Sequence, residues 1–235
     1  MSTLYIVSTP IGNLEDITFR ALRVLKEADV IFCEDTRVTR KLLEHYKINP
    51  PDGREGKPLK SFHAHSLIPS TQYMASFSNI AYVTDAGTPG ISDPGAKLVA
   101  LARESGMSIV PIPGPSALTA LLSVAGKEIK EFIFKGFPPH KKGRETFFRE
   151  VAKEAFGDMN SKCVGRPVIF YEAPTRVLKA LTFLDKFCPD NKIVIGRELT
   201  KKFEEVLEGT ASELLVILTT NPLKQKGEFA ILVIP

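Results

Sequence analysis

The stretch IAYVTDAGTPGISDPG, residues 80–95, decides the fold of this chain. Its opening residues, Ile80 to Thr84, are mostly β-branched, aromatic or small, which is typical of a buried strand. They run into a loop with three glycines and two prolines, and a helical pattern begins only at Leu98. Such connections usually take about two to six residues, and this one takes about ten. The sequence therefore predicts a ligand loop at the carboxyl edge of a sheet, with an ordinary connector as the simpler alternative.

The chain around this loop alternates between strands and helices through its first half. Short apolar runs typical of strands occur at Leu4–Ser8, Val30–Cys33, Leu59–Phe62 and Ser108–Pro111. Helical spacing of apolar residues separates them, as in the face formed by Phe19, Leu22 and Leu25. Alternation this regular predicts a mainly parallel sheet that is covered by helices on both faces.

The second half, after the proline-rich connector 111–115, has a different order of elements. Strands are predicted at Phe132–Phe137, Pro167–Tyr171, Lys192–Glu198, Glu204–Glu208 and Glu228–Ile234, and helices at Ala117–Ala125, Arg144–Ala155, Thr175–Phe187 and Ala211–Thr219. Because two strands follow one another directly around Lys201, they predict a hairpin and a mixed sheet. We expect a two-domain α/β protein, with an N-terminal domain of residues 1–112 and a C-terminal domain of residues 113–235.

Composition narrows the class of protein. The 235 residues are 43% hydrophobic and 25% charged, as in a globular protein, and no apolar run reaches the ~18 residues that cross a membrane. The three cysteines lie far apart, which indicates free thiols in a reducing cytoplasm and no metal site. The net charge of +4 permits a nucleic-acid partner without requiring one. Neither a G-x-G-x-x-G dinucleotide fingerprint nor a G-x-x-x-x-G-K-[ST] phosphate loop is present, which excludes those two nucleotide-binding classes.

Eight motifs occur in an order that matches one known family. They are LYIVSTPIGNLEDIT (4–18), EDTR (34–37), DAGTP (85–89), SDPG (92–95), PGPSA (113–117), GF (136–137), YEAPTR (171–176) and RELTK (197–201). Over nearly its whole length the chain thereby resembles the ribosomal RNA small subunit methyltransferase I family, a branch of the tetrapyrrole methylase superfamily. The resemblance implies a two-domain α/β fold with its cofactor in the cleft between the domains.

The resemblance also implies a function. It implies a cytoplasmic homodimer that uses S-adenosylmethionine to 2′-O-methylate the ribose of a cytidine in the decoding region of 16S rRNA. The implied partner is 16S rRNA or the small ribosomal subunit, with no membrane and no metal. Two features depart from the usual family pattern. The family usually has an acidic residue and an asparagine around the histidines of the run that here reads FHAHS (62–66), and many members continue beyond the last strand into a helical extension.

The central loop suits a sulfonium methyl donor. A sulfonium cation is compatible with carbonyl oxygens and apolar side chains, and neighbouring lysine or arginine disfavours it. The backbone of Asp85, Gly87 and Thr88, with the side chain of Ile91, can enclose the methionine part of such a donor. By the resemblance, Pro10 and Ile11 also line the pocket, Ser116 and Ala117 receive the methionine end, and Phe137, Tyr171 and Ala230 shape the adenosine end.

The proposed reaction also calls for a base. A ribose hydroxyl is a very weak acid, so a base within hydrogen-bond reach of it is desirable. Glu34, Asp35 and His63 are candidates because each lies at the end of a predicted strand. We expect Asp35 and Arg37 to position or activate the hydroxyl, with assistance from His63. A helix cap is an equally good interpretation of Asp35, and a structural hydrogen bond is a fair interpretation of His63.

Basic residues in the second half indicate where RNA binds. Lys141, Lys142 and Arg144 follow the GF motif, and Lys201 and Lys202 lie in the predicted hairpin. Such side chains bind phosphates and make the affinity sensitive to salt. A run of charges is more often just a solvated face, but the family resemblance favours RNA contact.

Two other functions stay open at this point. A protein from another branch of the superfamily would methylate a carbon of a porphyrin-type macrocycle with the same cofactor cleft. A protein that binds S-adenosylmethionine without catalysis, such as an RNA-assembly factor, is the alternative from a different class.

Overall fold

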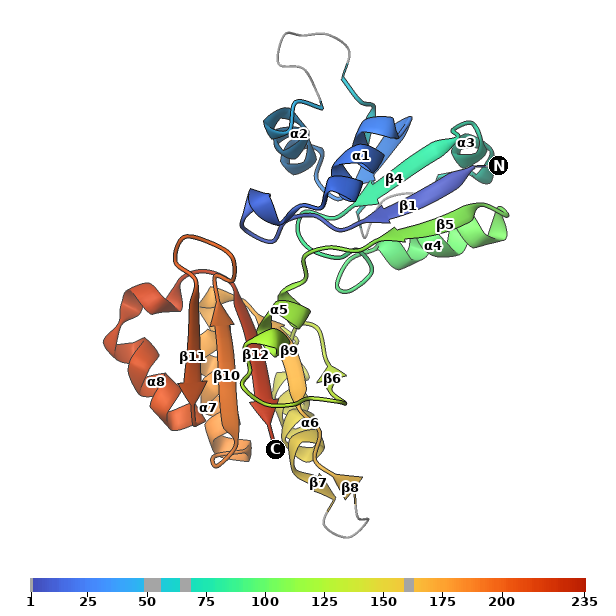
Figure 1. The fold of residues 1–235 in the computed structure, drawn as a ribbon. Coiled ribbons are helices and arrows are strands. Elements are labelled where there is room, and N and C mark those ends of the chain that lie inside the picture. The colour runs from blue at the N-terminus through green and yellow to red at the C-terminus, as the bar shows by residue number, and fades with distance from the viewer. Residues whose placement is uncertain (1, 49–55, 64–68, 159–162) are drawn as a thin grey trace. The chain divides into compact units, whose positions relative to one another are not determined.

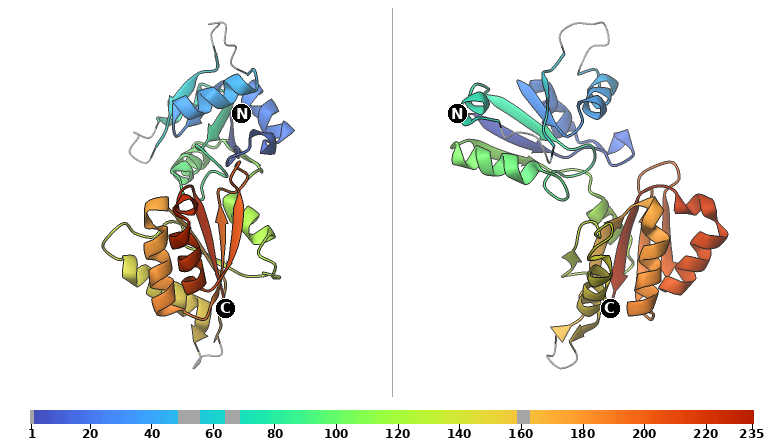
Figure 2. Two further views of the ribbon diagram at one scale, coloured as in Figure 1. Left: turned by 90° about the vertical axis from the view of Figure 1, so that its left-hand side faces the viewer. Right: turned by 180° about the vertical axis from the view of Figure 1, so that it is seen from behind.

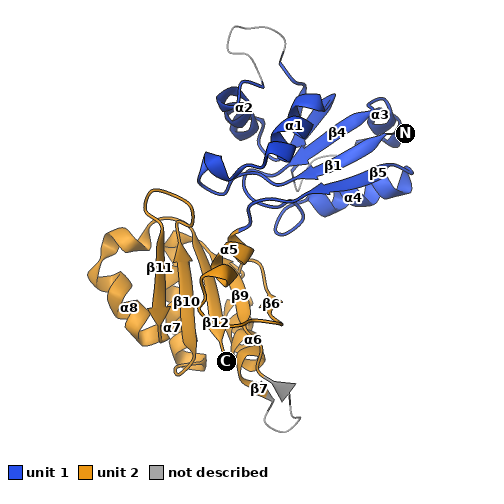
Figure 3. Cartoon of the chain, in the orientation of Figure 1, with its two compact units in different colours: residues 1–116 blue, residues 117–235 orange. Residues whose placement is uncertain are grey.

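The structure is a computed structural model that describes residues 2–48, 56–63, 69–158 and 163–235 (Figure 1). It divides into two compact units, residues 1–116 and residues 117–235 (Figure 3). The sequence placed the boundary after residue 112, whereas the contacts divide the chain after Ser116. The segment 113–116 therefore belongs with unit 1.

The described part of unit 1 forms a five-stranded sheet with the strand order β3-β2-β4-β1-β5, and all neighbours run parallel. The strands are β1 (Thr3–Val7), β2 (Val30–Cys33), β3 (Leu59–Ser61), β4 (Asn79–Val83) and β5 (Ser108–Ile112). Between them lie η1 (Leu14–Asp16), α1 (Phe19–Glu27), α2 (Thr36–His45), α3 (Thr71–Ala75) and α4 (Gly95–Glu104). The predicted parallel sheet is confirmed, and the central loop of the sequence joins β4 to α4.

Helices cover both faces of this sheet because its central strands are apolar on both sides. All four residues of β2 are buried, and they alternate between two clusters. Ile31 packs on the side of α1 and α2, whereas Phe32 packs on the side of α3 and α4. Polar caps set the helix starts: Thr18 accepts a hydrogen bond from the backbone of Ala21, and Asp35 caps α2 in the same way.

The described part of unit 2 contains a five-stranded mixed sheet with the order β11-β10-β12-β9-β6. Its strands are β6 (Ile133–Phe134), β9 (Val168–Glu172), β10 (Lys192–Arg197), β11 (Glu205–Gly209) and β12 (Phe229–Ile234). Only β6 and β9 are parallel, and the other neighbours are antiparallel. The predicted hairpin is confirmed, since β10 pairs with β11. A separate short pair consists of β7 (Gly157–Asp158) and β8 (Cys163–Val164).

An aromatic and aliphatic core holds unit 2 together. The helices are α5 (Ala117–Ser123), α6 (Arg144–Phe156), η2 (Pro174–Arg176), α7 (Val177–Phe187), α8 (Ala211–Thr220) and η3 (Pro222–Gln225). Helices α6, α7 and α8 pack on one face of the sheet, while α5 contacts β12 and β10 from the other (Figure 2). Phe148 stacks on Phe183 with ring centroids 5.2 Å apart, and it meets Phe170 edge to face.

Candidate active site

Three loops meet at the carboxyl edge of the unit 1 sheet because β1, β4 and β5 are parallel and adjacent. We call residues 8–13, 84–94 and 113–116 the loop platform. Thr9 and Gly87 exchange two backbone hydrogen bonds of 3.0 Å each. The Ser8 hydroxyl lies 3.1 Å from the Thr88 hydroxyl, which donates to the carbonyl oxygen of Pro115 at 3.0 Å. Hydrogen bonds therefore join all three loops into one surface.

Glycine is required at two points of the loop platform. Gly87 has φ +82°, and an added Cβ would lie 3.3 Å from Cγ2 of Ile11. An added Cβ at Gly114 would lie 3.0 Å from Cβ of Ser8. Both loops approach the β1 loop more closely than a side chain allows.

The long loop after β4 is held by a side chain whose role the sequence analysis missed. Asp93 accepts hydrogen bonds from the backbone N–H of Gly90 at 2.6 Å and of Gly95 at 2.8 Å. The Tyr82 hydroxyl also donates to it, at 3.2 Å. The sequence signal was available: an aspartate that precedes Pro94-Gly95 is a common turn former. Asp93 therefore fixes the loop in place and is not itself a candidate for contact with a substrate.

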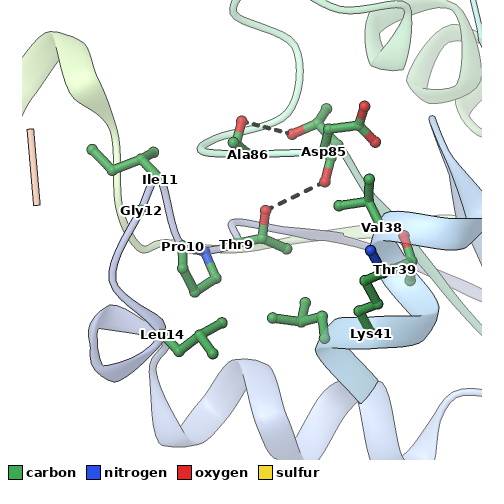
Figure 4. Close-up of a pocket in the computed structure, with 12 residues that line it drawn as sticks. Thr9, Pro10, Ile11, Gly12, Leu14, Val38, Thr39, Lys41, Asp85 and Ala86 are labelled. Atoms are coloured by element: carbon green, nitrogen blue, oxygen red, sulfur yellow. Dashed lines mark hydrogen bonds between the residues drawn. The ribbon is translucent and has the colours of Figure 1, made fainter. Parts of the chain in front are cut away.

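A cavity of about 350 Å³ lies between the β1 loop and α2 (Figure 4). Its lining comes from residues 9–12, Leu14, residues 84–86 and, on α2, Val38, Thr39, Lys41 and Leu42. The cavity contains the predicted site residues Pro10, Ile11 and Asp85. It contains none of Gly87, Thr88, Ile91 and Ser116.

Carboxyl groups gather beside this cavity, where β2 and β4 end. The backbone N–H of Asp35 donates to Oδ1 of Asp85 at 3.0 Å. Partial desolvation raises the pKa of Asp85, and burial together with the nearby Asp85 raises the pKa of Glu34. Asp35 behaves oppositely, because hydrogen bonds from Arg37 lower its pKa to about 2. Glu34 and Asp85 therefore bind a proton more tightly than an ordinary carboxylate, and Asp35 binds one less tightly.

The predicted catalytic residues lie at the ends of β2 and β3. Asp35 caps α2 by accepting the Arg37 backbone N–H at 2.8 Å, and the Arg37 side chain pairs with the same carboxylate at 2.6 Å. The helix-cap interpretation of Asp35 is therefore correct, and its carboxylate is already occupied. His63 is exposed and near enough to Glu34 to offset a small part of the rise in the pKa of that carboxyl group. His65, the second histidine of the run, lies outside the described residues.

The predicted adenosine residues form a local cluster in unit 2. The rings of Phe137 and Tyr171 are 5.4 Å apart, and Tyr171 lies opposite Ala230 in the pairing of β9 with β12. The Phe137 side chain is 54% exposed, which is unusual for a large apolar group. The family resemblance thus grouped three residues that are also close in space.

The predicted RNA-contact residues differ in what they can reach. Lys141, Lys142 and Lys202 are exposed, whereas Lys201 is engaged by Glu198 and Glu228, each at 3.0 Å.

The prediction for Arg144 is wrong. Arg144 is 3% exposed, and its guanidinium group pairs with the buried carboxylate of Glu172. Arg176 donates to the other oxygen of Glu172 at 2.9 Å. The position of Arg144 in the first turn of α6 faces the core, so its charge is part of an internal ion-pair cluster and does not contact RNA.

Among the residues that the structure describes, no group of three histidine, cysteine or acidic side chains is placed to hold a metal ion. Within the same residues, none of the helices is long and apolar enough to cross a membrane.

Comparison with known proteins gives the class first. A family model for tetrapyrrole (corrin/porphyrin) methylases matches residues 3–215. Among solved structures, the cobalamin biosynthetic enzyme cobalt precorrin-4 methyltransferase superposes with a TM-score of 0.61 and 20% identity, over 99% of this chain and 94% of that one. The fold is therefore that of the tetrapyrrole methylases.

The particular family follows from closer relatives. A ribosomal RNA small subunit methyltransferase I of Neisseria meningitidis serogroup B is 40% identical over 99% of this chain and 76% of its own length. The ribosomal RNA small subunit methyltransferase I of Borrelia garinii subsp. bavariensis is 43% identical over 98% of this chain and 97% of its own length. The chain belongs to the ribosomal RNA small subunit methyltransferase I family, as its motifs indicated. Membership makes it a methyltransferase with S-adenosylmethionine as cofactor.

The loop platform fits this cofactor. None of its residues, 8–13, 84–94 and 113–116, is a lysine or an arginine. The loops instead present backbone groups with Pro10 and Ile11 beside them, so a sulfonium cation would meet carbonyl oxygens and apolar walls.

Proposed function

We propose that this chain transfers the methyl group of S-adenosylmethionine to the 2′-hydroxyl of a cytidine ribose in the decoding region of 16S rRNA. The observation that carries the proposal is the nearly full-length similarity, at 40–43% identity, to relatives named for methylation of small-subunit ribosomal RNA. The cation-free loop platform beside a cavity and a cluster of carboxyl groups supports it. We also propose that the protein acts in the cytoplasm as a homodimer, as the family resemblance implies.

S-adenosylmethionine supplies an electrophilic methyl group, and the chain supplies its binding surface. We assign the methionine part to the backbone of Asp85, Gly87 and Thr88 and to the side chain of Ile91. Further contacts are assigned to Pro10, Ile11, Ser116 and Ala117. The adenine ring is assigned to the aromatic surface made by the exposed Phe137 and the half-buried Tyr171, with Ala230 beside it.

The geometry favours Asp85 as the proton acceptor. Oδ1 of Asp85 accepts the Asp35 backbone N–H, and Oδ2 accepts no hydrogen bond from any residue that the structure describes. Asp85 is exposed at the rim of the cavity, where a hydroxyl can reach it. Asp35 and Arg37, which hold one another, position the substrate in this assignment, and His63 assists from the end of β3.

Exposed lysines of unit 2 are assigned to the RNA backbone. Lys141, Lys142 and Lys202 can reach phosphates without first breaking a buried ion pair, so each should add to the salt dependence of binding. Reversal of Lys141 and Lys142 to glutamate should weaken RNA binding and leave cofactor affinity unchanged.

Mapping of ribose methylation on small-subunit rRNA, in cells with and without this gene, tests the proposal. The expected result is one cytidine whose 2′-O-methyl group disappears with the gene. A parallel assay with purified protein and labelled cofactor compares unmethylated small ribosomal subunits with a uroporphyrinogen-type macrocycle. Transfer to the macrocycle alone would identify a tetrapyrrole methyltransferase. Tight cofactor binding without transfer to either substrate would favour a non-catalytic assembly factor.

A further inference from the structure

The cavity between the β1 loop and α2 extends from the loop platform to a wall that the cofactor assignment does not use. It shares Pro10, Ile11 and Asp85 with the assigned cofactor residues, but α2 forms its opposite wall. Nothing in the cofactor assignment uses α2. The α2 wall therefore calls for a different ligand.

The lining of the cavity suits a flat, mostly apolar group. Pro10, Ile11 and Leu14 line one side, and Val38 and Leu42 line the α2 side. Leu14 is 38% exposed and Val38 is 41% exposed, so these apolar side chains remain open to an incoming group. Ligand pockets combine such walls with a few polar groups.

The cavity is large enough to hold a nucleoside. Its volume of about 350 Å³ is near the lower end of the range of roughly 300–1,000 Å³ that small-molecule pockets occupy. The space is therefore sufficient for one nucleoside of a longer strand.

A positively charged face of α2 adjoins the cavity at Lys41, which is part of its lining. Arg37, Arg40 and Lys41 are spaced i, i+3 and i+4 on α2, so they share one side of the helix, and all three are exposed. Arg37 is neutralised by Asp35. Arg40 and Lys41 make no ion pair with any residue in the described ranges. The Lys41 side chain runs along the α2 wall of the cavity (Figure 4).

We infer that this cavity binds the base of the nucleotide to be methylated, taken from a single-stranded segment of RNA, while Lys41 binds a phosphate next to that base. RNA is the ligand that combines a planar base with regularly placed negative charge. Proteins that read single-stranded RNA hold unstacked bases against apolar or aromatic side chains and track the backbone with basic ones. The inference rests on the proposed function, because it names where that function's substrate lies.

Two oligoribonucleotides separate the base from the phosphates. The first is a short strand whose only base is one central cytidine, with abasic residues on both sides; the second is the same strand with no base at all. The strands carry identical phosphates. The wild-type chain, with cofactor present, should bind the cytidine strand about tenfold more tightly, as expected for one base contact. Equal affinity for the two strands would overturn the inference.

Leu42→Trp tests whether the base contact lies in this cavity. The larger side chain should fill the cavity and reduce the ratio of the affinities for the two strands to about one. The affinity for S-adenosylmethionine, measured by calorimetry, should be unchanged. Val38→Trp, at a more exposed position of the same wall, repeats the test if Leu42→Trp unfolds the chain. Leu223→Trp, on the exposed side of η3 in unit 2, is the matched control and should keep the tenfold ratio.

Lys41→Gln tests the phosphate contact separately. It should weaken binding of both strands equally and reduce the salt slope by about one. Glu44→Gln, one turn further along α2, is the control and should not lower that slope. If Leu42→Trp instead lowers cofactor affinity and leaves the strand ratio intact, the cavity belongs to the cofactor and the inference is wrong. These binding measurements need no methyl transfer, so they distinguish failure of the inference from failure of the proposed function.

Discussion

The two units of this chain bury polar side chains for different purposes. In unit 1 the buried polar residues that the structure describes are hydroxyl groups: Ser8, Thr9, Thr39 and Thr84. In unit 2 they are mostly charged: Arg144, Glu172 and Arg197, with Asn191. Three of the unit 1 hydroxyl residues hold loops of the site, whereas the unit 2 charges bind one another or backbone carbonyls.

Strand direction explains this difference. Parallel strands in unit 1 bring their loops to one edge, so neutral hydroxyl groups can fasten a binding surface there and leave it free of cations. Antiparallel neighbours in unit 2 end on opposite edges of the sheet, so no comparable set of loops gathers at one edge. Buried charge in unit 2 therefore serves stability, and only exposed charge in unit 2 is available to a partner.

The largest expected effect is on catalysis in unit 1. Asp85→Asn keeps an oxygen that can accept the Asp35 N–H but removes the base, so we expect kcat to fall by about 10² to 10⁴. Cofactor affinity and thermal stability should be unchanged. Turnover of small ribosomal subunits measures the effect. Retention of full turnover would exclude Asp85, and a comparable loss in Glu34→Gln alone would transfer the role to Glu34.

The next effect tests the assignment of charge within unit 2. Arg144→Ala should destabilise the chain by roughly 3–5 kcal/mol, or somewhat less because Arg176 remains, since it leaves the buried Glu172 carboxylate short of a partner. Lys141→Ala, a nearby exposed position, should change stability by no more than about 0.5 kcal/mol and weaken RNA binding. Urea denaturation measures the change in stability, and fluorescence anisotropy measures the change in RNA binding. The reverse pattern would restore Arg144 to the RNA surface.

A smaller effect concerns the fit of the loop platform. Gly87→Ala and Gly90→Ala both place a side chain at positive φ, at a cost of about 1–2 kcal/mol each. Only Gly87→Ala also brings its Cβ to 3.3 Å from Ile11, whereas the space around Gly90 is open. Gly87→Ala should therefore lower cofactor affinity more than Gly90→Ala does, as measured by calorimetry. Equal losses would show that backbone strain alone matters.

The smallest effect is an acid dependence of stability at Asp35. Its pKa of about 2 lies below the ordinary value of 3.8 because Arg37 and the start of α2 favour the ionised form. The folded state therefore binds fewer protons than the unfolded state in this range, and the stabilisation is lost as pH falls from about 4 to about 2. The melting temperatures of the wild-type chain and of Asp35→Asn should therefore converge as the pH falls through this range. Parallel curves would contradict it.

The sequence was sufficient for the architecture because the strand and helix signals were local. The four apolar residues of β2 are adjacent in the sequence, and so are the glycines and prolines that follow β4. Each signal is therefore visible without knowledge of the fold. The convergence of Ser8, Thr88 and Pro115 was foreseeable only in outline, since it follows from parallel strand order. The grouping of Phe137, Tyr171 and Ala230 came from family resemblance, not from any pattern in the residues.

What the sequence could not supply was the direction of single side chains. Arg144 belongs to a basic run, and only its place on the inner side of α6 shows that it is buried. Lys41 belongs to no motif, and only the cavity beside α2 makes it a candidate for substrate contact. The cap at Asp35 was foreseeable as an alternative, whereas the free Oδ2 of Asp85 depends on where β2 and β4 end relative to each other.

The three hydrogen bonds that Asp93 accepts have a consequence for binding. They hold the loop between β4 and α4 in one conformation through contacts internal to unit 1, two to backbone N–H groups and one to Tyr82. The chain therefore orders this loop during folding, so a ligand need not supply the free energy to immobilise it. Such a preorganised surface should bind its methyl donor with little loss of loop entropy.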